Sequence, residues 1–274
     1  MGFEIQEHAL RRKLSDELHA RSFHEFEGGG RFIRFIFMTE STDETIIEPI
    51  NRFLKKIDTP QITSKEKFKR VEMASFSLRI ERHNEFVTIG FIVKGEKTRT
   101  GLAEGAFDPE VNETLPFRLI EEIPAKLFHA IWLEIGGKPP KQLTPAKVQN
   151  IIKGRSGASS LISGGEAQVH FSFDIDSNGF SRSVLFNNAI PASRLGRIVL
   201  RMVELETYRM LALLGLPTAT QYINQLGQTE QKLSDLTHQL TAHISSGDEE
   251  VQELLPELSQ MAAKVEQIAA DTSY

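Results

Sequence analysis

Residues 78–93 read LRIERHNEFVTIGFIV, and the alternation within this stretch decides the fold. Leu78 and Ile80 are apolar at even positions, whereas Val87, Ile89 and Phe91 are apolar at odd positions. One continuous strand cannot change faces without a turn or a bulge. A two-residue turn at residues 83–84 restores the parity and predicts a hairpin, with a bulge at the same place as the alternative. The predicted cross-strand pairs are Arg82 with Glu85, Ile80 with Val87, Leu78 with Ile89 and Phe76 with Phe91.

The segments before this hairpin indicate a helix, a strand and a second helix. Residues 8–20 place leucines at positions 10, 14 and 18, which is the spacing of a helix with one apolar face. The run RFIRFIFM at 31–38 is almost continuously apolar and is typical of a strand covered on both faces. Residues 46–57 again show helical spacing of apolar side chains, and Pro60 prevents that helix from continuing.

The segments after the hairpin predict more strands and a short helix. Residues 169–175 and 180–186 alternate around the sequence DSNG at 176–179, which is strong turn chemistry. Residues 126–133 are expected to form a further strand between the two hairpins. Thr144 followed by Pro145 is a good helix start, and Gly154 is a good stop.

The chain after Pro191 is predicted to be helical almost to its end. Pro217 and Gly247 divide it into three helices. Leucines at 226, 233, 236 and 240 and apolar residues from 251 to 268 follow a three–four spacing, which predicts an antiparallel helical hairpin. We therefore predict an α+β fold: a mixed β-sheet with flanking helices in a domain over residues 1–190, followed at 191–274 by a C-terminal helical hairpin and a stalk-like helix.

The composition is that of a folded protein and excludes several classes of function. Of the 274 residues, 40% are hydrophobic and 25% are charged, and the absence of cysteine excludes disulfides and thiolate chemistry. The net charge is −5, and residues 229–274 carry nine acidic residues against two lysines. Neither this acidic segment nor the rest of the chain is basic enough for general nucleic-acid binding. No apolar run is long enough to span a bilayer.

Two short polar segments together form a candidate polar cluster. A general acid–base site would need these side chains to converge in a pocket, whereas a charged hairpin end and a helix end explain them without chemistry. The candidate residues are Glu17, His19, Arg21, Glu81, Arg82, His83 and Glu85.

Residues 193–215 form a predicted helix that is apolar around most of its circumference. Arg197, Arg201 and Glu204 fall on one narrow polar stripe. Glu206 and Arg209 fall inside the apolar sector, three residues apart, where charges are costly unless they are paired. We predict that they are structural charges, paired with each other or with partners on the sheet, and a ligand site is the alternative.

The known motifs for metals and cofactors are incomplete or missing. DIDSNG at 174–179 resembles the start of a calcium loop, but Leu185 stands where the loop needs a bidentate glutamate, so a plain turn is predicted. There is no phosphate-binding loop, no nucleophile elbow, no HExxH motif and no dinucleotide fingerprint. We expect neither a metal nor a cofactor.

Three segments together carry a resemblance to a known family. They read ELHAR at 17–21, ERHNEF at 81–86 and GRIVLRMVELETYRMLALLGLP at 196–217. The chain resembles a bacterial family of membrane-anchored proteins that contain a domain of unknown function. It departs from the family pattern at Ser22, where proline is usual, and at Asn84, where threonine is usual.

The resemblance implies a context for the chain. Members of the family continue through a basic helical region to apolar segments near their C terminus, which implies a domain at the cytoplasmic face of the bacterial inner membrane, anchored by a region outside this sequence. The order of elements is also similar to that of CorA-type magnesium transporters. We therefore expect a homo-oligomeric scaffold, sensor or gating domain without nucleic-acid partners. The alternative is an enzyme or small-ligand-binding domain that uses the candidate polar cluster.

Overall fold

The computed structural model describes residues 8–9, 11–12, 25–39, 44–64, 66–95, 98–110, 114–246 and 251–272. The chain divides into two compact units, Met1–Tyr208 and Arg209–Tyr274. This division falls later than the boundary expected after residue 190, because the helix that begins at Ala192 contacts the sheet of the first unit through Glu206 and His129. Most of the helix predicted at 8–20 lies outside the described residues.

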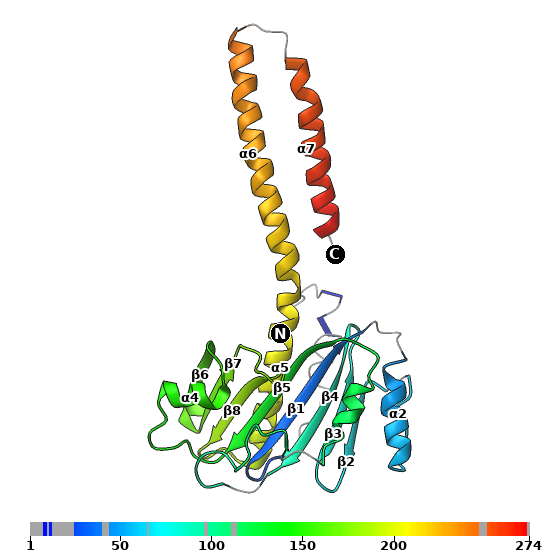
Figure 1. The fold of residues 1–274 in the computed structure, drawn as a ribbon, viewed down its shortest axis with the longest axis vertical. Coiled ribbons are helices and arrows are strands. Elements are labelled where there is room, and N and C mark those ends of the chain that lie inside the picture. The colour runs from blue at the N-terminus through cyan, green and yellow to red at the C-terminus, as the bar shows by residue number, and fades with distance from the viewer. Residues whose placement is uncertain are drawn as a thin grey trace, which may run out of the picture. The chain divides into compact units, whose positions relative to one another are not determined.

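The first unit is built on one eight-stranded sheet (Figure 1), and its fold is α+β as predicted. The order across the sheet is β2-β3-β4-β1-β5-β8-β7-β6, with β5 and β8 parallel and the other neighbours antiparallel. The strands are β1 (Gly30–Met38), β2 (Phe68–Glu72), β3 (Ser77–Arg82), β4 (Phe86–Lys94), β5 (Leu127–Gly136), β6 (Gly157–Ile162), β7 (Ala167–Ser172) and β8 (Ser181–Asn187).

The central strand β1 confirms the prediction from its apolar run. Phe32 and Ile33 point to opposite faces of the sheet, and both are almost completely buried. Burial on both faces is what a near-continuous apolar strand requires. The strand expected at 126–133 is also confirmed, as β5.

One face of the sheet carries the main hydrophobic core. Three helices contribute to that core: α2 (Ile47–Lys56), α3 (Phe117–Glu121) and α4 (Pro145–Ile152). Thr144 caps α4 by accepting a hydrogen bond from the Lys147 backbone N–H, as the Thr-Pro start predicts. The 3₁₀ turn η2 (Ser163–Gly165) connects β6 to β7.

The opposite face of the sheet is covered by α5 (Ala192–Ala212), which crosses behind β5 and β8 in Figure 1. Its buried side chains recur at helical spacing, so that one stripe of the helix is withdrawn from water. They are Leu195, Val199, Leu200, Met202, Val203, Glu206 and Thr207.

The hairpin predicted around residues 83–84 forms, but its turn lies one residue later than predicted. The observed partners are Ile80 with Ile89 and Leu78 with Phe91, and the backbone N–H of His83 donates to the carbonyl of Phe86. The two-residue turn is therefore at 84–85. The His83 ring stacks on Phe86 with centroids 4.0 Å apart, a cross-strand contact that favours this register. Even-numbered residues of β3 still share a face with odd-numbered residues of β4, so the predicted faces of both strands are correct.

The second hairpin has shorter strands than predicted. β7 ends at Ser172, and Phe173 and Ile175 are exposed in the connection. The Asp176 carboxylate accepts hydrogen bonds from the backbone N–H groups of Asn178 (2.8 Å) and Phe180 (3.0 Å). These contacts form an Asx turn, which confirms the plain-turn interpretation of the DSNG sequence.

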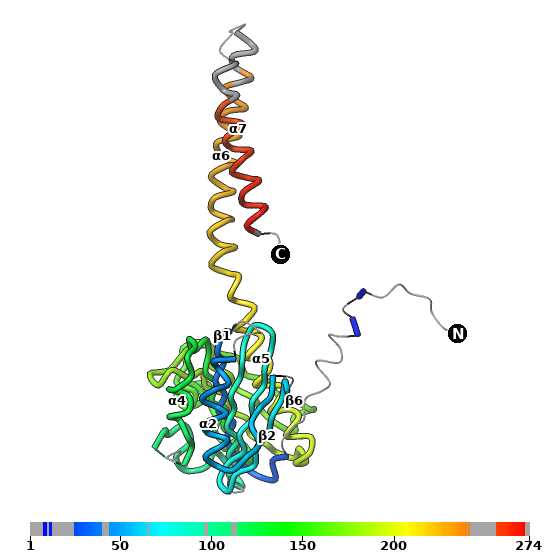
Figure 2. The backbone as a smooth tube through the Cα atoms, turned by 90° about the vertical axis from the view of Figure 1, so that its right-hand side faces the viewer, coloured from blue at the N-terminus to red at the C-terminus, as the bar shows by residue number. Residues whose placement is uncertain are grey.

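The second unit contains α6 (Leu216–Ser246) and α7 (Val251–Thr272), with the 3₁₀ turn η3 (Leu213–Gly215) before them. The two helices lie side by side (Figure 2), and the Tyr222 hydroxyl donates to Asp271 at 2.9 Å, so the start of α6 meets the end of α7. The predicted antiparallel hairpin is confirmed. Its seam differs from the prediction, because Leu236 is buried while Leu226 and Leu233 are exposed.

Candidate functional site

The first buried polar cluster lies on the face of β1, β3 and β4 opposite the main core. Nη2 of Arg34 lies 3.2 Å from Oε2 of Glu81, and Nε of Arg79 donates to Oε1 at 2.7 Å. The Thr88 hydroxyl donates to Oε2 at 3.2 Å. All four side chains are almost completely buried. Strand alternation places them together, because each occupies a position whose side chain points to this face.

Both guanidinium groups of this cluster approach the single carboxylate of Glu81. Burial alone would raise the pKa of Glu81, but Arg34, a hydrogen bond with His83 and Arg79 together hold that pKa well below its ordinary value. A cation–π contact further stabilises Arg79, whose guanidinium lies 4.7 Å from the Phe68 ring centroid. Glu81 is therefore a carboxylate that stays ionised at neutral pH, which suits a structural role better than proton transfer.

The remaining members of the candidate polar cluster do not join Glu81 and His83. Arg82 points to the opposite face of the sheet, where its guanidinium contacts Glu44 at 2.8 Å and donates to the Thr63 carbonyl. Glu85 is exposed in the turn. Glu17, His19 and Arg21 lie outside the described residues. Within the described part of the chain, the sequence-predicted cluster is therefore divided between two faces.

A second buried cluster connects α5 to the sheet. Oε1 of Glu206 lies 3.3 Å from Nε2 of His129 on β5, and the Ser181 hydroxyl on β8 lies 2.9 Å from the same nitrogen and 3.2 Å from Glu206. These residue types can form a nucleophilic triad, but here serine and glutamate meet the same ring nitrogen. His129 Nδ1 has no hydrogen-bond partner among the described residues. A triad instead needs the base to be oriented through its second nitrogen.

The sequence-predicted residues of α5 have different environments. Glu206 is buried as expected, and it contacts His129 and Ser181. Arg209 is half-buried, and its pairing with Glu206 stays a prediction. Arg197 and Arg201 are exposed and Glu204 is half-buried, in keeping with the predicted polar stripe.

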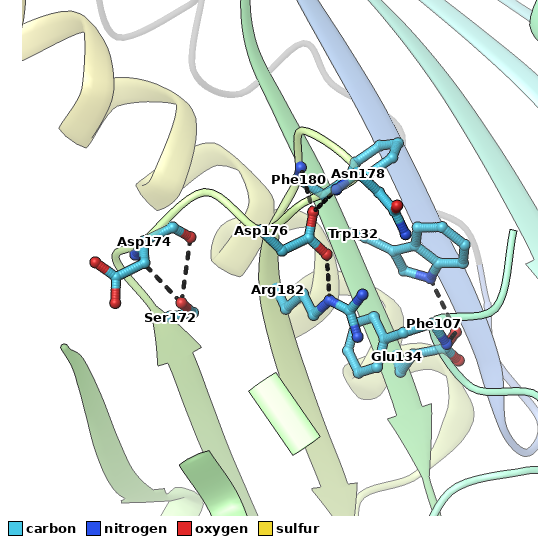
Figure 3. Close-up of polar contacts among 9 residues, drawn as sticks. All are labelled: Phe107, Trp132, Glu134, Ser172, Asp174, Asp176, Asn178, Phe180 and Arg182. Carbon is cyan, nitrogen blue, oxygen red and sulfur yellow. Dashed lines mark hydrogen bonds and ion pairs between the residues drawn. The ribbon is translucent and has the colours of Figure 1, made fainter. Parts of the chain in front are cut away.

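A third cluster, on the core side of the sheet, was not predicted from the sequence (Figure 3). Nε of Arg182 lies 2.5 Å from Oδ2 of Asp176, and the guanidinium lies 4.7 Å from the Phe107 ring centroid. Burial raises the pKa of Asp176, but hydrogen bonds from the Phe180 amide and from Arg182 outweigh it and lower that pKa below its ordinary value. The aspartate thus fixes both the turn and the arginine.

Glu134 contacts the loop that contains Phe107. Its Oε1 accepts hydrogen bonds from the Trp132 indole at 2.9 Å and from the Phe107 backbone N–H at 3.0 Å, and Nε of Arg31 lies 3.5 Å away. Burial raises the pKa of Glu134 above its ordinary value, and the attraction of Arg31 offsets this only in part. Phe107 has a φ of +61°, which is unusual for a bulky side chain, and the bond to Glu134 helps to hold it.

The described residues offer little for a metal or a cofactor. They contain no group of three His, Asp or Glu side chains able to hold a metal ion. A cavity of about 810 Å³ is lined by loop residues that include Arg99, Lys138 and Asn188. The Asn188 amide is already engaged with the Gly165 carbonyl, and Arg99 and Lys138 are exposed. This cavity therefore shows no arrangement specific to one ligand.

Comparison with known proteins identifies a family but no function. No curated protein and no solved structure matches the chain. Among the helices of the described residues, none combines the length and the apolar composition needed to cross a lipid bilayer. The profile of a family described as "Protein of unknown function (DUF3422)" matches residues 6–274, which is nearly the whole chain, and the protein therefore belongs to that family.

Proposed function

We propose that this protein is a non-enzymatic, self-associating scaffold domain. The observation that carries the proposal is the state of Glu81, which is buried and ionised between Arg34 and Arg79. A carboxylate paired in this way helps to define one packing of three strands. Both of its oxygens already contact neighbouring side chains, so it is not available to bind a substrate. The clusters at Glu206 and Asp176 are likewise engaged by neighbouring side chains and backbone groups.

The enzyme or ligand-binding alternative has less support. It needs Glu81, His83, Arg82 and Glu85 to act on one bound group, but the side chains of Glu81 and Arg82 point to opposite faces of the sheet. The arrangement of Ser181, His129 and Glu206 lacks the second-nitrogen contact of a triad and is closed to solvent. This alternative stays a prediction.

We further propose that the scaffold is held at the cytoplasmic face of a bacterial inner membrane by a region outside these 274 residues. The support is the resemblance carried by residues 17–21, 81–86 and 196–217. A role in ion transport, by analogy with CorA-type transporters, rests only on the order of the elements along the chain, and the proposal does not include it.

Extraction of membranes from cells that express the natural gene tests the attachment. Alkaline carbonate removes proteins held by surface contacts and leaves inserted proteins in the pellet. We expect the protein to stay in the pellet. Its release into the supernatant, together with a peripheral marker, would contradict membrane anchoring and leave the scaffold proposal to be judged by self-association.

A further inference from the structure

The outer surface of α6 carries a second apolar seam that its intramolecular partner does not use. Leu216 and Ile223 are seven residues apart, as are Leu226 and Leu233, and the two series interleave at the three–four spacing of heptad a and d positions. Their side chains are 57%, 67%, 37% and 47% exposed, respectively. Four large apolar side chains at heptad positions are thus open to solvent on one helix.

The contact with α7 uses a neighbouring face of α6. Thr229 and Leu236, which are seven residues apart, are only 7% exposed, and Tyr222 at the preceding heptad step bonds to Asp271. Each of these residues immediately precedes an a position of the exposed seam. Because α7 occupies this adjacent stripe, the a and d positions remain available to another helix.

The charge pattern indicates which helix that is. Residues 210–229 contain no Asp, Glu, Lys, Arg or His, although a quarter of the whole chain is charged. Depletion of charge is the compositional mark of an interface core rather than of a solvated helix face. An identical helix has the same heptad period and brings no opposing charge over this stretch, so it matches the seam along its length.

We propose that α6 of one protein molecule packs against α6 of a second copy as a parallel two-stranded coiled coil, through Leu216, Ile223, Leu226 and Leu233. β-Branched Ile223 at an a position, with leucines at the d positions 226 and 233, favours parallel dimers. Glu230, the polar residue at the next a position, then meets its counterpart, which costs stability and fixes the register. This inference rests on the proposed self-association and names the surface that produces it.

Single-cysteine cross-linking tests the seam directly, because the natural chain contains no cysteine. In a parallel coiled coil the two copies of residue 223 face each other. We expect Ile223→Cys to form a covalent dimer under mild oxidation, at a rate at least about tenfold above that of the adjacent control Asn224→Cys. Asn224 is exposed and lies outside both the seam and the α7 contact. Equal cross-linking of the two variants would overturn the proposal.

Two substitutions of opposite effect complete the test. Ile223→Lys is expected to raise the dimer dissociation constant at least about tenfold, and Glu230→Leu to lower it by a similar factor. Both positions are exposed, so circular dichroism should show unchanged helix content. A wild-type dimer that neither substitution affects would refute the seam but leave the scaffold proposal standing. A wild type that is monomeric throughout would refute both, and loss of vesicle binding in Ile223→Lys without a dimer would assign the seam to lipid instead.

Discussion

Oε2 of Glu81 lies 3.2 Å from Nη2 of Arg34, and neither residue is more than 3% exposed. Another buried carboxylate, Glu134, lies on the opposite face, where Nε of Arg31 is 3.5 Å away and Arg182 is a weaker electrostatic influence. The two glutamates are buried alike, yet the pKa of Glu81 is lowered and that of Glu134 is raised. The closer arginines and the additional hydrogen bond with His83 around Glu81 account for this difference in pKa. The two residues can therefore be distinguished by experiment.

Replacing Glu81 with glutamine should destabilise the protein strongly. Glu81→Gln leaves Arg34 and Arg79 buried without their counter-charge, and breaking a buried pair in this way costs about 3–5 kcal/mol. Urea unfolding followed by circular dichroism measures the change. Glu85→Gln, at an exposed turn position, is the matched control and should change the free energy of unfolding by less than about 0.5 kcal/mol. A loss no greater than that of the control would show that the cluster is not structural.

Replacing Glu134 with glutamine should change the free energy of unfolding in a way that depends on pH, and in the opposite direction to the replacement of Glu81. The raised pKa of Glu134 in the folded state means that its contribution to stability is present below the unfolded pKa and lost as pH rises through the folded pKa. Glu134→Gln avoids this loss, so its free energy of unfolding relative to wild type should rise with pH above about 4.3.

The comparison with Glu81 provides the control for that experiment. The lowered pKa of Glu81 gives stability that is present above the unfolded pKa and lost as pH falls through the folded pKa. The free energy of Glu81→Gln relative to wild type should therefore fall as pH rises towards about 4.3 and then stay constant. Parallel curves for the two variants would contradict the assigned environments.

The Asp176 carboxylate should behave as a turn residue rather than as a calcium ligand. Asp176→Asn can still accept from the Asn178 and Phe180 amides but loses the ion pair with Arg182, so we expect a loss of about 1–3 kcal/mol in the free energy of unfolding. The melting temperature of the wild type should be the same in millimolar calcium and in chelator. An upward shift with calcium that Asp176→Asn abolishes would restore the calcium-loop interpretation.

Ser181 should be chemically inert. It is 1% exposed, and the histidine that contacts it lacks the orientation of a catalytic base. A fluorophosphonate probe that labels activated serines should therefore leave the native protein unmodified, as it should leave Ser181→Ala. Labelling of the wild type that is absent from Ser181→Ala would identify a hydrolase and contradict the scaffold proposal.

Local patterns were enough to predict most of the fold. The apolar run of β1, the helical spacing of α2 and the capping sequence of α4 each determine an element through its own residues. The first hairpin shows the limit of this approach. Its faces follow from parity, but the position of its turn depends on the contact between His83 and Phe86 across the strands, which alternation does not specify.

The polar clusters were predicted only in part, for the same reason. Glu81 stood out in a charged hairpin segment and Glu206 as a charge on an apolar helix face, but Arg34 and His129 are 47 and 77 positions away from them along the chain. The environment of Glu134 depends on the positive φ of Phe107, which has no signature in the sequence. Trp132 and Glu134, two residues apart on a buried strand, were the available signal that a polar contact lies there.

Sedimentation equilibrium of the 274-residue chain tests the central claim of self-association most directly. The monomer mass is 30.9 kDa. We predict that the measured mass rises from this value to twice this value as the protein concentration increases, and that Ile223→Lys shifts the transition to higher concentration. A mass of 30.9 kDa for the wild type at every concentration up to its solubility limit would contradict the account.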